Sequence, residues 1–318
     1  MPAGTILIGG STASGKSALA LALAERTDGV VVNADSVQLY RDLPILTAQP
    51  GPLDLTRAEH RLYGILDSDE MASVALWLAR VEQVLGEGAA SGRLALVTGG
   101  TGLYFKALLE GLPAIPDIPA ELRAALRQSR APAADLHAQL GLLDPALAGR
   151  LEPSDRQRIL RGLEVVRATG RPLSAWQADP RRRAIVPQPV AGMALLPPAE
   201  VVDPRIAERL DAMLEAGVLP ELQAFRAGAG QSAIPLAKAD GVAELGAFLD
   251  GRWDIEKARA ATIRKVRRYA KRQRTFFRGQ LADRLPSVAA AVDNATAGDL
   301  ADQLLAQLKT ANRADTRC

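Results

Sequence analysis

The chain has 318 residues, of which 48% are hydrophobic and 24% charged, so it can bury a sizeable core and is not a disordered protein. Its single cysteine, Cys318, excludes a disulfide framework and a cysteine zinc site. The net charge of +3 is small, and the apolar run at 18–24 is too short to cross a bilayer and follows no basic segment. We therefore expect a soluble, cytoplasmic protein with no signal peptide and no membrane contact.

The first part of the chain alternates between strands and helices. Short apolar runs predict strands at 5–8, 30–33 and 93–98. Helices with an apolar face are expected at 16–26, 71–85 and 101–110, and a polar loop at 34–52. This alternation is typical of an α/β fold with a parallel sheet, to which a further strand at 191–196 can return.

A helical insertion interrupts this pattern. Proline-rich segments at 111–119 and 180–189 enclose a stretch with helical periodicity and no convincing strand. We predict an α/β core formed by residues 1–112 and 191–280, and an all-helical insertion domain at 113–190. Long helices are expected at 205–216 and 255–277, and the Ala-rich, polar residues 281–318 are expected to form a loosely held tail, either a helix or a frayed end.

Residues 10–17, Gly-Ser-Thr-Ala-Ser-Gly-Lys-Ser, fit the phosphate-loop pattern and have the required strand before them and helix after them. In such a loop, backbone N–H groups and the helix amino end converge on an anion. Lys16 adds a positive charge, and the Ser17 hydroxyl can hold Mg²⁺. The sequence therefore predicts a P-loop NTPase-like core. The residues expected to bind a diphosphate or triphosphate are Gly10, Ser11, Thr12, Ala13, Ser14, Gly15, Lys16 and Ser17.

An acidic residue follows the second predicted strand, not the third. Nucleotide hydrolases usually place a carboxylate at the end of a buried strand to organise Mg²⁺, but the strand at 93–98 is followed by Gly99-Gly100-Thr101-Gly102. Asp35 instead follows the strand at 30–33. Because parallel strands open on one crevice at their carboxyl ends, Asp35 and Thr101 should face the bound phosphates. This departure indicates that the phosphates leave as one unit.

A concentrated basic segment lies near the end of the chain. Residues 259–278 contain nine Lys and Arg residues and no acidic residue, so the rest of the chain carries a formal charge of −6. On a helix, residues at spacings of three and four form one basic stripe: Arg264, Arg267 or Arg268, Lys271, Arg274 and Arg278. Such a stripe on an acidic body predicts a polyanionic partner.

Taken together, these residues match a known family. The matching blocks are GSTASGKS (10–17), NADSVQLYRDLPILTAQP (33–50), EHRLYGILD (59–67), VTGGTGLYFKALLEGL (97–112), SDRQRILRGLEVVRATGRPLSAWQ (154–177) and RYAKRQRTFFR (268–278). In this order, they make the chain resemble the bacterial tRNA dimethylallyltransferases of the IPP transferase family. The blocks span residues 10 to 278, nearly the whole chain.

The resemblance implies a reaction and a set of site residues. The phosphate loop would hold dimethylallyl diphosphate with Mg²⁺, and the adenine of adenosine 37, flipped out of the tRNA anticodon loop into a channel, would be alkylated at N6. Asp35 would act as general base, Thr101 would lie beside the reacting centre, and Arg205 would reach the diphosphate. Residues implied to contact tRNA are Asp35, Ser36, Val37, Gln38, Thr101, Arg123, Gln157, Arg158, Ile159, Leu160, Arg161, Arg264, Arg267, Arg268, Lys271, Arg272 and Gln273. Because Asp240–Ala243 depart from the family pattern, no RNA contact is expected there.

Three other readings stay open at this level. An adenylate isopentenyltransferase acting on free AMP or ATP would need neither a basic helix nor a helical insertion. A P-loop small-molecule kinase would consume ATP, and Asp35 could serve as its base. An RNA-binding NTPase would need an acid at the end of the strand at 93–98, and that acid is missing. With no heptad seam evident, a monomer is expected.

Overall fold

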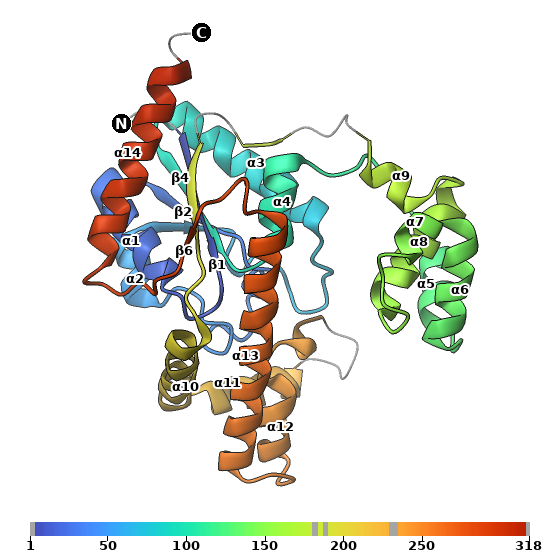
Figure 1. Cartoon of the computed structure of the whole chain (residues 1–318). Coiled ribbons are helices and arrows are strands. Elements are labelled where there is room, and N and C mark those ends of the chain that lie inside the picture. The colour runs from blue at the N-terminus through green and yellow to red at the C-terminus, as the bar shows by residue number, and fades with distance from the viewer. Residues whose placement is uncertain (1–3, 180–183, 187–189, 229–234, 316–318) are drawn as a thin grey trace. The chain divides into compact units, whose positions relative to one another are not determined.

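The computed structural model describes residues 4–179, 184–186, 190–228 and 235–315 (Figure 1). Contacts between residues divide the chain into two compact units. The core unit comprises Met1–Leu109 and Ile185–Cys318, and the helical unit comprises Glu110–Ala184. No helix within the described ranges is both long and apolar enough to cross a membrane.

The core unit is built on a six-stranded sheet with the strand order β3-β2-β4-β1-β5-β6, in which every neighbouring pair is parallel. Its strands are β1 (Gly4–Gly10), β2 (Val30–Asn33), β3 (Glu59–Arg61), β4 (Leu94–Gly99), β5 (Val190–Leu195) and β6 (Ser287–Val288). The α/β fold and the four longer strands were predicted and are confirmed. The short edge strands β3 and β6 were not predicted, because three and two residues carry no periodic signal.

Helices surround this sheet and connect its strands. Those of the core unit are α1 (Lys16–Thr27), α2 (Pro52–Arg57), α3 (Val74–Ser91), α4 (Gly102–Glu110), α10 (Ala199–Glu215), α11 (Val218–Gly228), the 3-10 helix η1 (Pro235–Lys238), α12 (Val242–Leu249), α13 (Ile255–Gln280) and α14 (Ala297–Asp315). The central strands are buried along nearly their whole length and are mostly apolar, and Ile6, Ile8 and Leu96 are completely buried. Burial on both faces is what a parallel sheet covered by helices requires.

The prediction of a loosely held tail is wrong for much of residues 281–318. Strand β6 extends the sheet beside β5, and α14 packs on α1. Ala301, Leu304 and Leu308 of α14 are almost completely buried against Ala20 and Ala24 of α1. The physical reason is that these apolar residues recur at spacings of three and four and form one helix face, and that small alanines let two helices approach closely.

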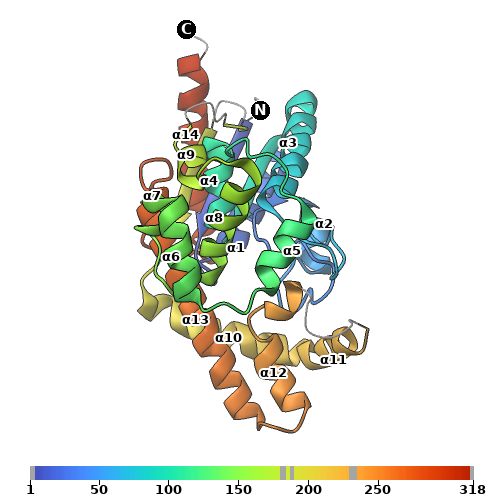
Figure 2. The same cartoon turned by 90° about the vertical axis from the view of Figure 1, so that its right-hand side faces the viewer.

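The helical unit consists of five helices and, in its described residues, no strand. They are α5 (Ala120–Gln128), α6 (Ala133–Leu143), α7 (Pro145–Ala148), α8 (Arg156–Thr169) and α9 (Leu173–Gln177), as Figure 2 shows. Its own apolar core includes Leu140, Ile159 and Leu163, all completely buried. The buried Asp144 carboxylate accepts hydrogen bonds from Leu147 N and from Ser174 Oγ, which joins α7 to α9.

Candidate functional site

The phosphate loop lies between β1 and α1, as its sequence motif predicts. Gly15 caps α1 with a φ of 91°, and a Cβ at this position would meet the Val292 carbonyl oxygen at 2.0 Å, so only glycine fits. The hydroxyls of Ser11 and Ser14 are buried and have no hydrogen-bond partner in the described part of the chain. Because buried hydroxyls are normally paired, these two donors in a phosphate loop favour an anionic ligand.

Lys16 is the cation of this loop. Its Nζ atom donates to the Ser11 carbonyl oxygen at 2.6 Å. Burial lowers the pKa of the Lys16 ammonium to about 8; the negative charge of Asp35 opposes this shift and the positive charge of Arg209 adds to it. An anion bound in the loop would favour the charged ammonium.

Asp35 lies just beyond β2, and the turn that holds it is fastened by Asn33. The Asn33 Oδ1 atom accepts from Asp35 N at 2.8 Å, and its Nδ2 atom donates to the carbonyl oxygens of Asp35 and Leu62, both at 3.0 Å. Asp35 Oδ1 accepts from Val37 N at 3.2 Å. Burial raises the pKa of the Asp35 carboxyl, although this hydrogen bond and the charges of Lys16 and Arg209 oppose the shift. A carboxylate with a raised pKa is a stronger base than an ordinary aspartate.

Thr101 joins the end of β4 to the turn at Asp35. Its Oγ1 atom accepts from Ser36 N at 3.0 Å, and its backbone N donates to the Ala34 carbonyl oxygen at 3.1 Å. Asp35 and Thr101 therefore belong to two neighbouring strand ends that are hydrogen-bonded to each other, as their placement in a parallel sheet predicted.

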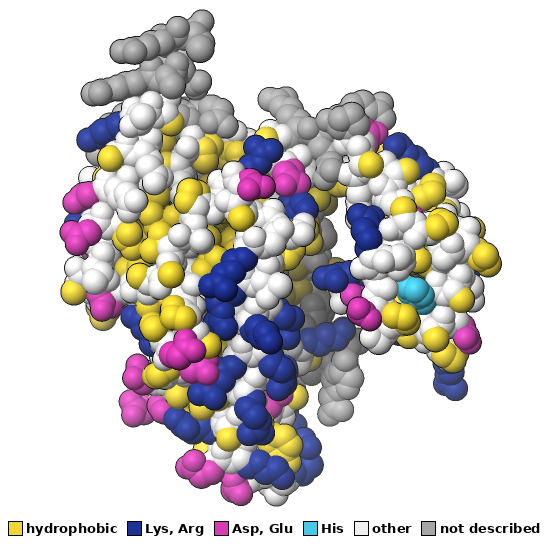
Figure 3. Space-filling view, viewed as in Figure 1, with side chains coloured by type: hydrophobic (Ala, Val, Ile, Leu, Met, Phe, Trp, Pro, Cys, Tyr) yellow, Lys and Arg dark blue, Asp and Glu magenta, His cyan; other side chains and the backbone are white. Residues whose placement is uncertain are grey.

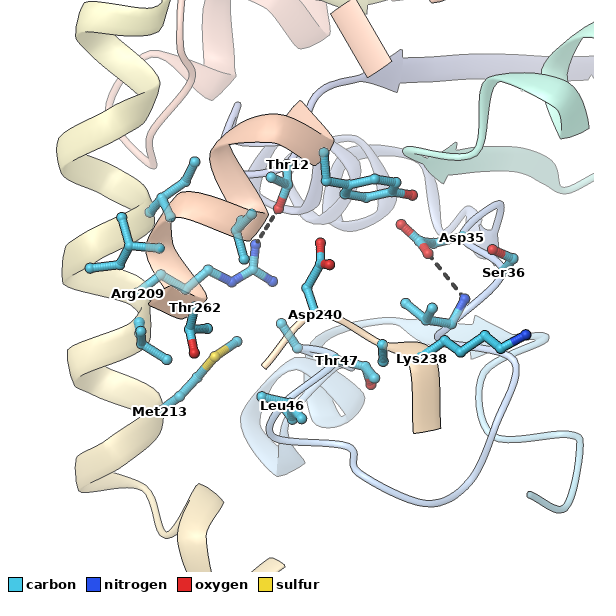
Figure 4. A pocket seen from close by; sticks show the side chains of 18 of the residues that line it. Thr12, Asp35, Ser36, Leu46, Thr47, Arg209, Met213, Lys238, Asp240 and Thr262 are labelled. Atoms are coloured by element: carbon cyan, nitrogen blue, oxygen red, sulfur yellow. Dashed lines mark hydrogen bonds between the residues drawn. The ribbon is translucent and has the colours of Figure 1, made fainter. Parts of the chain in front are cut away.

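Helix α10 contributes two arginines, of which only Arg205 was predicted. The Arg205 guanidinium donates to Val292 O at 2.9 Å and to Ala13 O at 3.4 Å, so it fastens the phosphate loop to the segment before α14. Arg209, one turn further along α10, reaches Thr12 Oγ1 at 3.5 Å (Figure 4). The signal for Arg209 was its spacing of four residues from Arg205, which puts both on one face of the helix.

Two adjoining cavities open at these residues. The phosphate cavity, of about 420 Å³, is lined by Lys16, Ser17, Arg205 and Arg209. The carboxylate cavity, of about 280 Å³, contains Asp35 and is largely apolar. Arg209 and Ala48 line both cavities, so a ligand that fills them passes beside the Arg209 guanidinium. Figure 4 shows Asp35, Thr12, Asp240 and Arg209 around the carboxylate cavity.

The wall shared by the two cavities is a loop that Glu221 holds in place. The Glu221 carboxylate, on α11, accepts from Ile45 N at 2.6 Å and from Leu46 N at 3.0 Å. Gln38, which was predicted to contact tRNA, donates through Nε2 to Thr47 O at 3.0 Å and Ala48 O at 2.7 Å. The role of Glu221 was missed, because nothing in the sequence relates residues 176 positions apart.

The predicted RNA contacts of the core unit lie mostly on one exposed helix face. Arg264, Arg267, Arg268, Lys271 and Arg272 of α13 are exposed, and Lys and Arg side chains gather along this helix in Figure 3. Ser36 and Val37 line the carboxylate cavity. Gln273 departs from the prediction: it is only 5% exposed, and both ends of its carboxamide are hydrogen-bonded within the protein.

In the helical unit, the predicted RNA contacts divide into exposed and buried residues. Gln157, Arg158 and Arg161 are exposed along α8, and Arg123 of α5 is partly exposed. Ile159 and Leu160 are buried in the core of this unit, so their side chains do not offer a surface to RNA. The reason is the helical period: residues 157, 158 and 161 face outward, whereas 159 and 160 face inward.

The sheet and its site define a class of protein. A phosphate loop follows the first strand of a parallel sheet, and a buried carboxylate lies across an adjoining cavity. This arrangement is typical of a phosphate-loop enzyme that holds a diphosphate or triphosphate beside a second substrate.

Comparisons with known proteins identify the family within this class. Residues 38–280 match the family model described as IPP transferase. The chain is 47% identical over 283 residues to a tRNA dimethylallyltransferase of Nitrobacter hamburgensis, covering 88% of this chain and 89% of that protein. It is 50% identical over 278 residues to a tRNA dimethylallyltransferase of a Methylobacterium species, covering 86% and 90%. The chain belongs to the IPP transferase family.

A solved structure is similar over the whole chain. The full-length tRNA isopentenylpyrophosphate transferase of Bacillus halodurans has a TM-score of 0.70 and 28% sequence identity, covering 98% of this chain and 99% of that one. The family resemblance inferred from the sequence blocks is thereby confirmed.

Proposed function

We propose that this protein is a tRNA dimethylallyltransferase, which transfers the dimethylallyl group of dimethylallyl diphosphate to N6 of adenosine 37, next to the tRNA anticodon. The observation that carries the proposal is the pair of adjoining cavities that share Arg209, one cationic and the other holding Asp35. The relatives named above support the acceptor and the transferred group. Replacing adenosine 37 by guanosine in the tRNA should abolish transfer, and undiminished transfer would contradict the assignment.

The reaction needs groups that stabilise the departing diphosphate and a base that accepts a proton from N6, and the site can supply both. The N6 lone pair of adenine is delocalised into the ring, so attack requires an electrophilic carbon, and an allylic carbon becomes one as its bond to diphosphate weakens. Lys16, the loop N–H groups and Arg209 would stabilise the negative charge that develops on the departing diphosphate. Thr12 and Arg205 would also contact the diphosphate.

Asp35 would accept the proton that N6 loses in the reaction. As the bond between N6 and the allylic carbon forms, the bond from that carbon to the diphosphate oxygen breaks, and one N6 proton passes to Asp35. Its burial supports this role, because a raised pKa makes the carboxylate a better proton acceptor. The hydroxyl of Thr101, beside it in the neighbouring turn, would border the reacting centre.

The residues present fit a magnesium ion held jointly with the diphosphate. Ser17 is exposed and lines the phosphate cavity, and hydroxyl oxygen is a ligand that Mg²⁺ accepts. Among the described residues, no group of three or more carboxylate, His or Cys side chains could hold a metal ion by itself, which suits an ion bound mainly by substrate phosphates and water. Mg²⁺ held at Ser17 would neutralise charge on the leaving diphosphate.

Dimethylallyl diphosphate binding should weaken as pH rises through about 8. Burial lowers the pKa of Lys16 to about 8, so the free protein loses the ammonium charge above that pH, whereas the bound diphosphate requires it. Titrations without RNA, from pH 7 to 10, should show falling affinity and proton uptake on binding. The ligand's phosphates are already ionised in this range.

The matched variant for this titration is Lys16→Arg, whose guanidinium keeps its charge to pH 12 and above. It should bind with little dependence on pH over the same range. An affinity of the wild-type protein that stays flat from pH 7 to 10 would contradict the role given to Lys16.

The tRNA is proposed to bind along the basic face of α13 and the exposed arginines of α8. Bringing a base out of an RNA loop costs a few kcal/mol, less than from a duplex, and contacts to the RNA backbone offset that cost. The carboxylate cavity lies beside α13, since Thr262, Val266 and Tyr269 of this helix line it. A flipped adenine that enters there would meet Asp35. A tRNA acceptor also favours the cytoplasm as the place of action.

Affinity for tRNA should fall steeply with salt, and Lys271→Ala should reduce the slope of log affinity against log salt by about one unit. The reason is that Lys271 is exposed on α13 and would release one counterion on binding a phosphate. Lys309→Ala, on the exposed face of α14, is the matched control and should leave the slope unchanged. Equal slopes for wild type and Lys271→Ala would remove this contact from the proposal.

One chain is proposed to be the catalytic unit. Both cavities are lined by residues of a single chain, and the two substrates can meet at Arg209 without a residue from a second copy. We therefore propose that the monomer is active.

A further inference from the structure

The inner face of α13 lies directly against backbone at the ends of β1 and β4. A Cβ at Gly9 would meet the Phe277 ring at 2.4 Å, and one at Gly102 would meet the Phe276 ring at 2.2 Å. A Cβ at Gly100, which follows β4, would lie 2.0 Å from Gln273 Nε2. The helix can therefore approach the phosphate loop and the turn at Thr101 only because glycine occupies all three positions.

Gln273 uses this close approach to join the two strand ends. Its Oε1 atom accepts from Thr12 N, in the phosphate loop, at 2.8 Å, and its Nε2 atom donates to Gly100 O at 3.0 Å. Tyr269, one turn earlier on α13, lines the carboxylate cavity. One carboxamide thus spans from the phosphate loop to the residue before Thr101.

The surroundings of Gln273 separate it from the RNA-binding face of the same helix. Its neighbours Lys271 and Arg272 are exposed, whereas Gln273 is 5% exposed. Among side chains of this length, glutamine presents both an acceptor and a donor at every pH, whereas an ionised glutamate only accepts. The pair of contacts requires both, because an amide N–H lies on one side and a carbonyl oxygen on the other.

We infer that Gln273 is a positioning residue of the diphosphate site and not an RNA contact. By holding the Thr12 amide at a set distance from Gly100, it fixes the phosphate loop relative to Thr101 and Asp35. The inference rests on the proposed function in so far as the loop binds a diphosphate. A shift of about 1 Å between reacting groups can cost about a hundredfold in rate, so loss of this bridge should reduce turnover as well as diphosphate affinity.

The test compares Gln273→Met and Gln273→Glu with Lys271→Met, two positions away on the exposed face. Two affinities are measured separately, for dimethylallyl diphosphate with Mg²⁺ and for an anticodon stem-loop RNA, together with the melting temperature, kcat and KM. We expect Gln273→Met to weaken diphosphate binding and lower kcat, each by about ten- to a hundredfold, with RNA affinity within about twofold of wild type. Lys271→Met should weaken RNA binding and leave diphosphate binding unchanged.

Gln273→Glu supplies a readout that loss of packing would not move. A protonated glutamic acid presents a C=O and an O–H, and so can replace both groups of the carboxamide, whereas the carboxylate has no donor for Gly100 O. The ratio of the diphosphate affinity of Gln273→Glu to that of the wild type is measured at each pH. This ratio should rise toward one as pH falls from 8 to 5.5. This arm decides the question if Gln273→Met fails to fold.

Weakened RNA binding with unchanged diphosphate binding in the Gln273 variants would overturn the inference and return the residue to the RNA interface. Unchanged diphosphate affinity and kcat in both variants would overturn it too, as would a Gln273→Glu ratio independent of pH. Failure of the proposed function is distinguishable, because it would appear as a wild-type protein that binds no dimethylallyl diphosphate.

Discussion

Replacing Asp35 with asparagine should lower turnover by about 10²- to 10⁴-fold, the usual effect of removing a positioned general base. Asparagine keeps the shape of the side chain and an oxygen that can accept from Val37 N, but it cannot take the N6 proton. In the wild type, because burial raises the pKa of Asp35, the rate should fall on the acid side at a higher pH than an ordinary aspartate would give. The kcat values of both proteins, measured against pH, test this.

Asp240→Asn is the matched control for this prediction. Asp240 also lines the carboxylate cavity and lies 3.9 Å from Lys265 Nζ, but the mechanism gives it no proton to accept. Its variant should stay within about tenfold of wild-type turnover, well below the loss expected for a general base. Affinity for tRNA should change little in Asp35→Asn. A fully active Asp35→Asn would contradict the assignment of the base.

Arg209→Met should lower turnover by about 10²- to 10³-fold, comparable to removing one donor from a site that stabilises developing negative charge. The Arg209 guanidinium borders both cavities and lies next to Thr12 of the phosphate loop, where charge grows on the departing diphosphate. Methionine keeps much of the apolar volume and removes the charge. Single-turnover rates with saturating tRNA separate this effect from RNA binding.

Arg226→Met removes the same charge elsewhere in the core unit. Arg226 pairs with Asp250 at 2.6 Å, with both side chains at least one-third exposed, and lines neither cavity. It should therefore keep near wild-type turnover. Similar losses in both variants, or no loss in Arg209→Met, would count against a role for Arg209 at the diphosphate.

The parts that could be predicted from sequence depend on local signals. A strand, a glycine-rich turn and a helix at 5–26 specify the phosphate loop within one stretch of chain, and Asp35 follows directly from the end of the next strand. Because parallel strands share one open edge, these local patterns are enough to predict that Asp35 and Thr101 lie close together.

The parts that could not be predicted depend on contacts between distant segments. Thr12 N is 261 residues from Gln273 Oε1, and Glu221 holds a loop 175 and 176 residues away. A motif that contains Gln273 among basic residues indicates RNA binding, but which residues face inward depends on where the helix docks. The same limit applies to α14, whose apolar face has meaning only beside α1.

The most direct test of the central claim is the mass of the product nucleosides. The purified protein is incubated with Mg²⁺, dimethylallyl diphosphate and unmodified tRNA carrying A36-A37-A38, or with AMP in place of tRNA, and the digested nucleosides are analysed. The proposal predicts an adenosine heavier by one C5H8 unit from the tRNA and no prenylated product from AMP. Prenylated AMP with unmodified tRNA would contradict it in favour of a free-nucleotide enzyme, and consumption of added ATP without prenylation of either acceptor would favour a kinase.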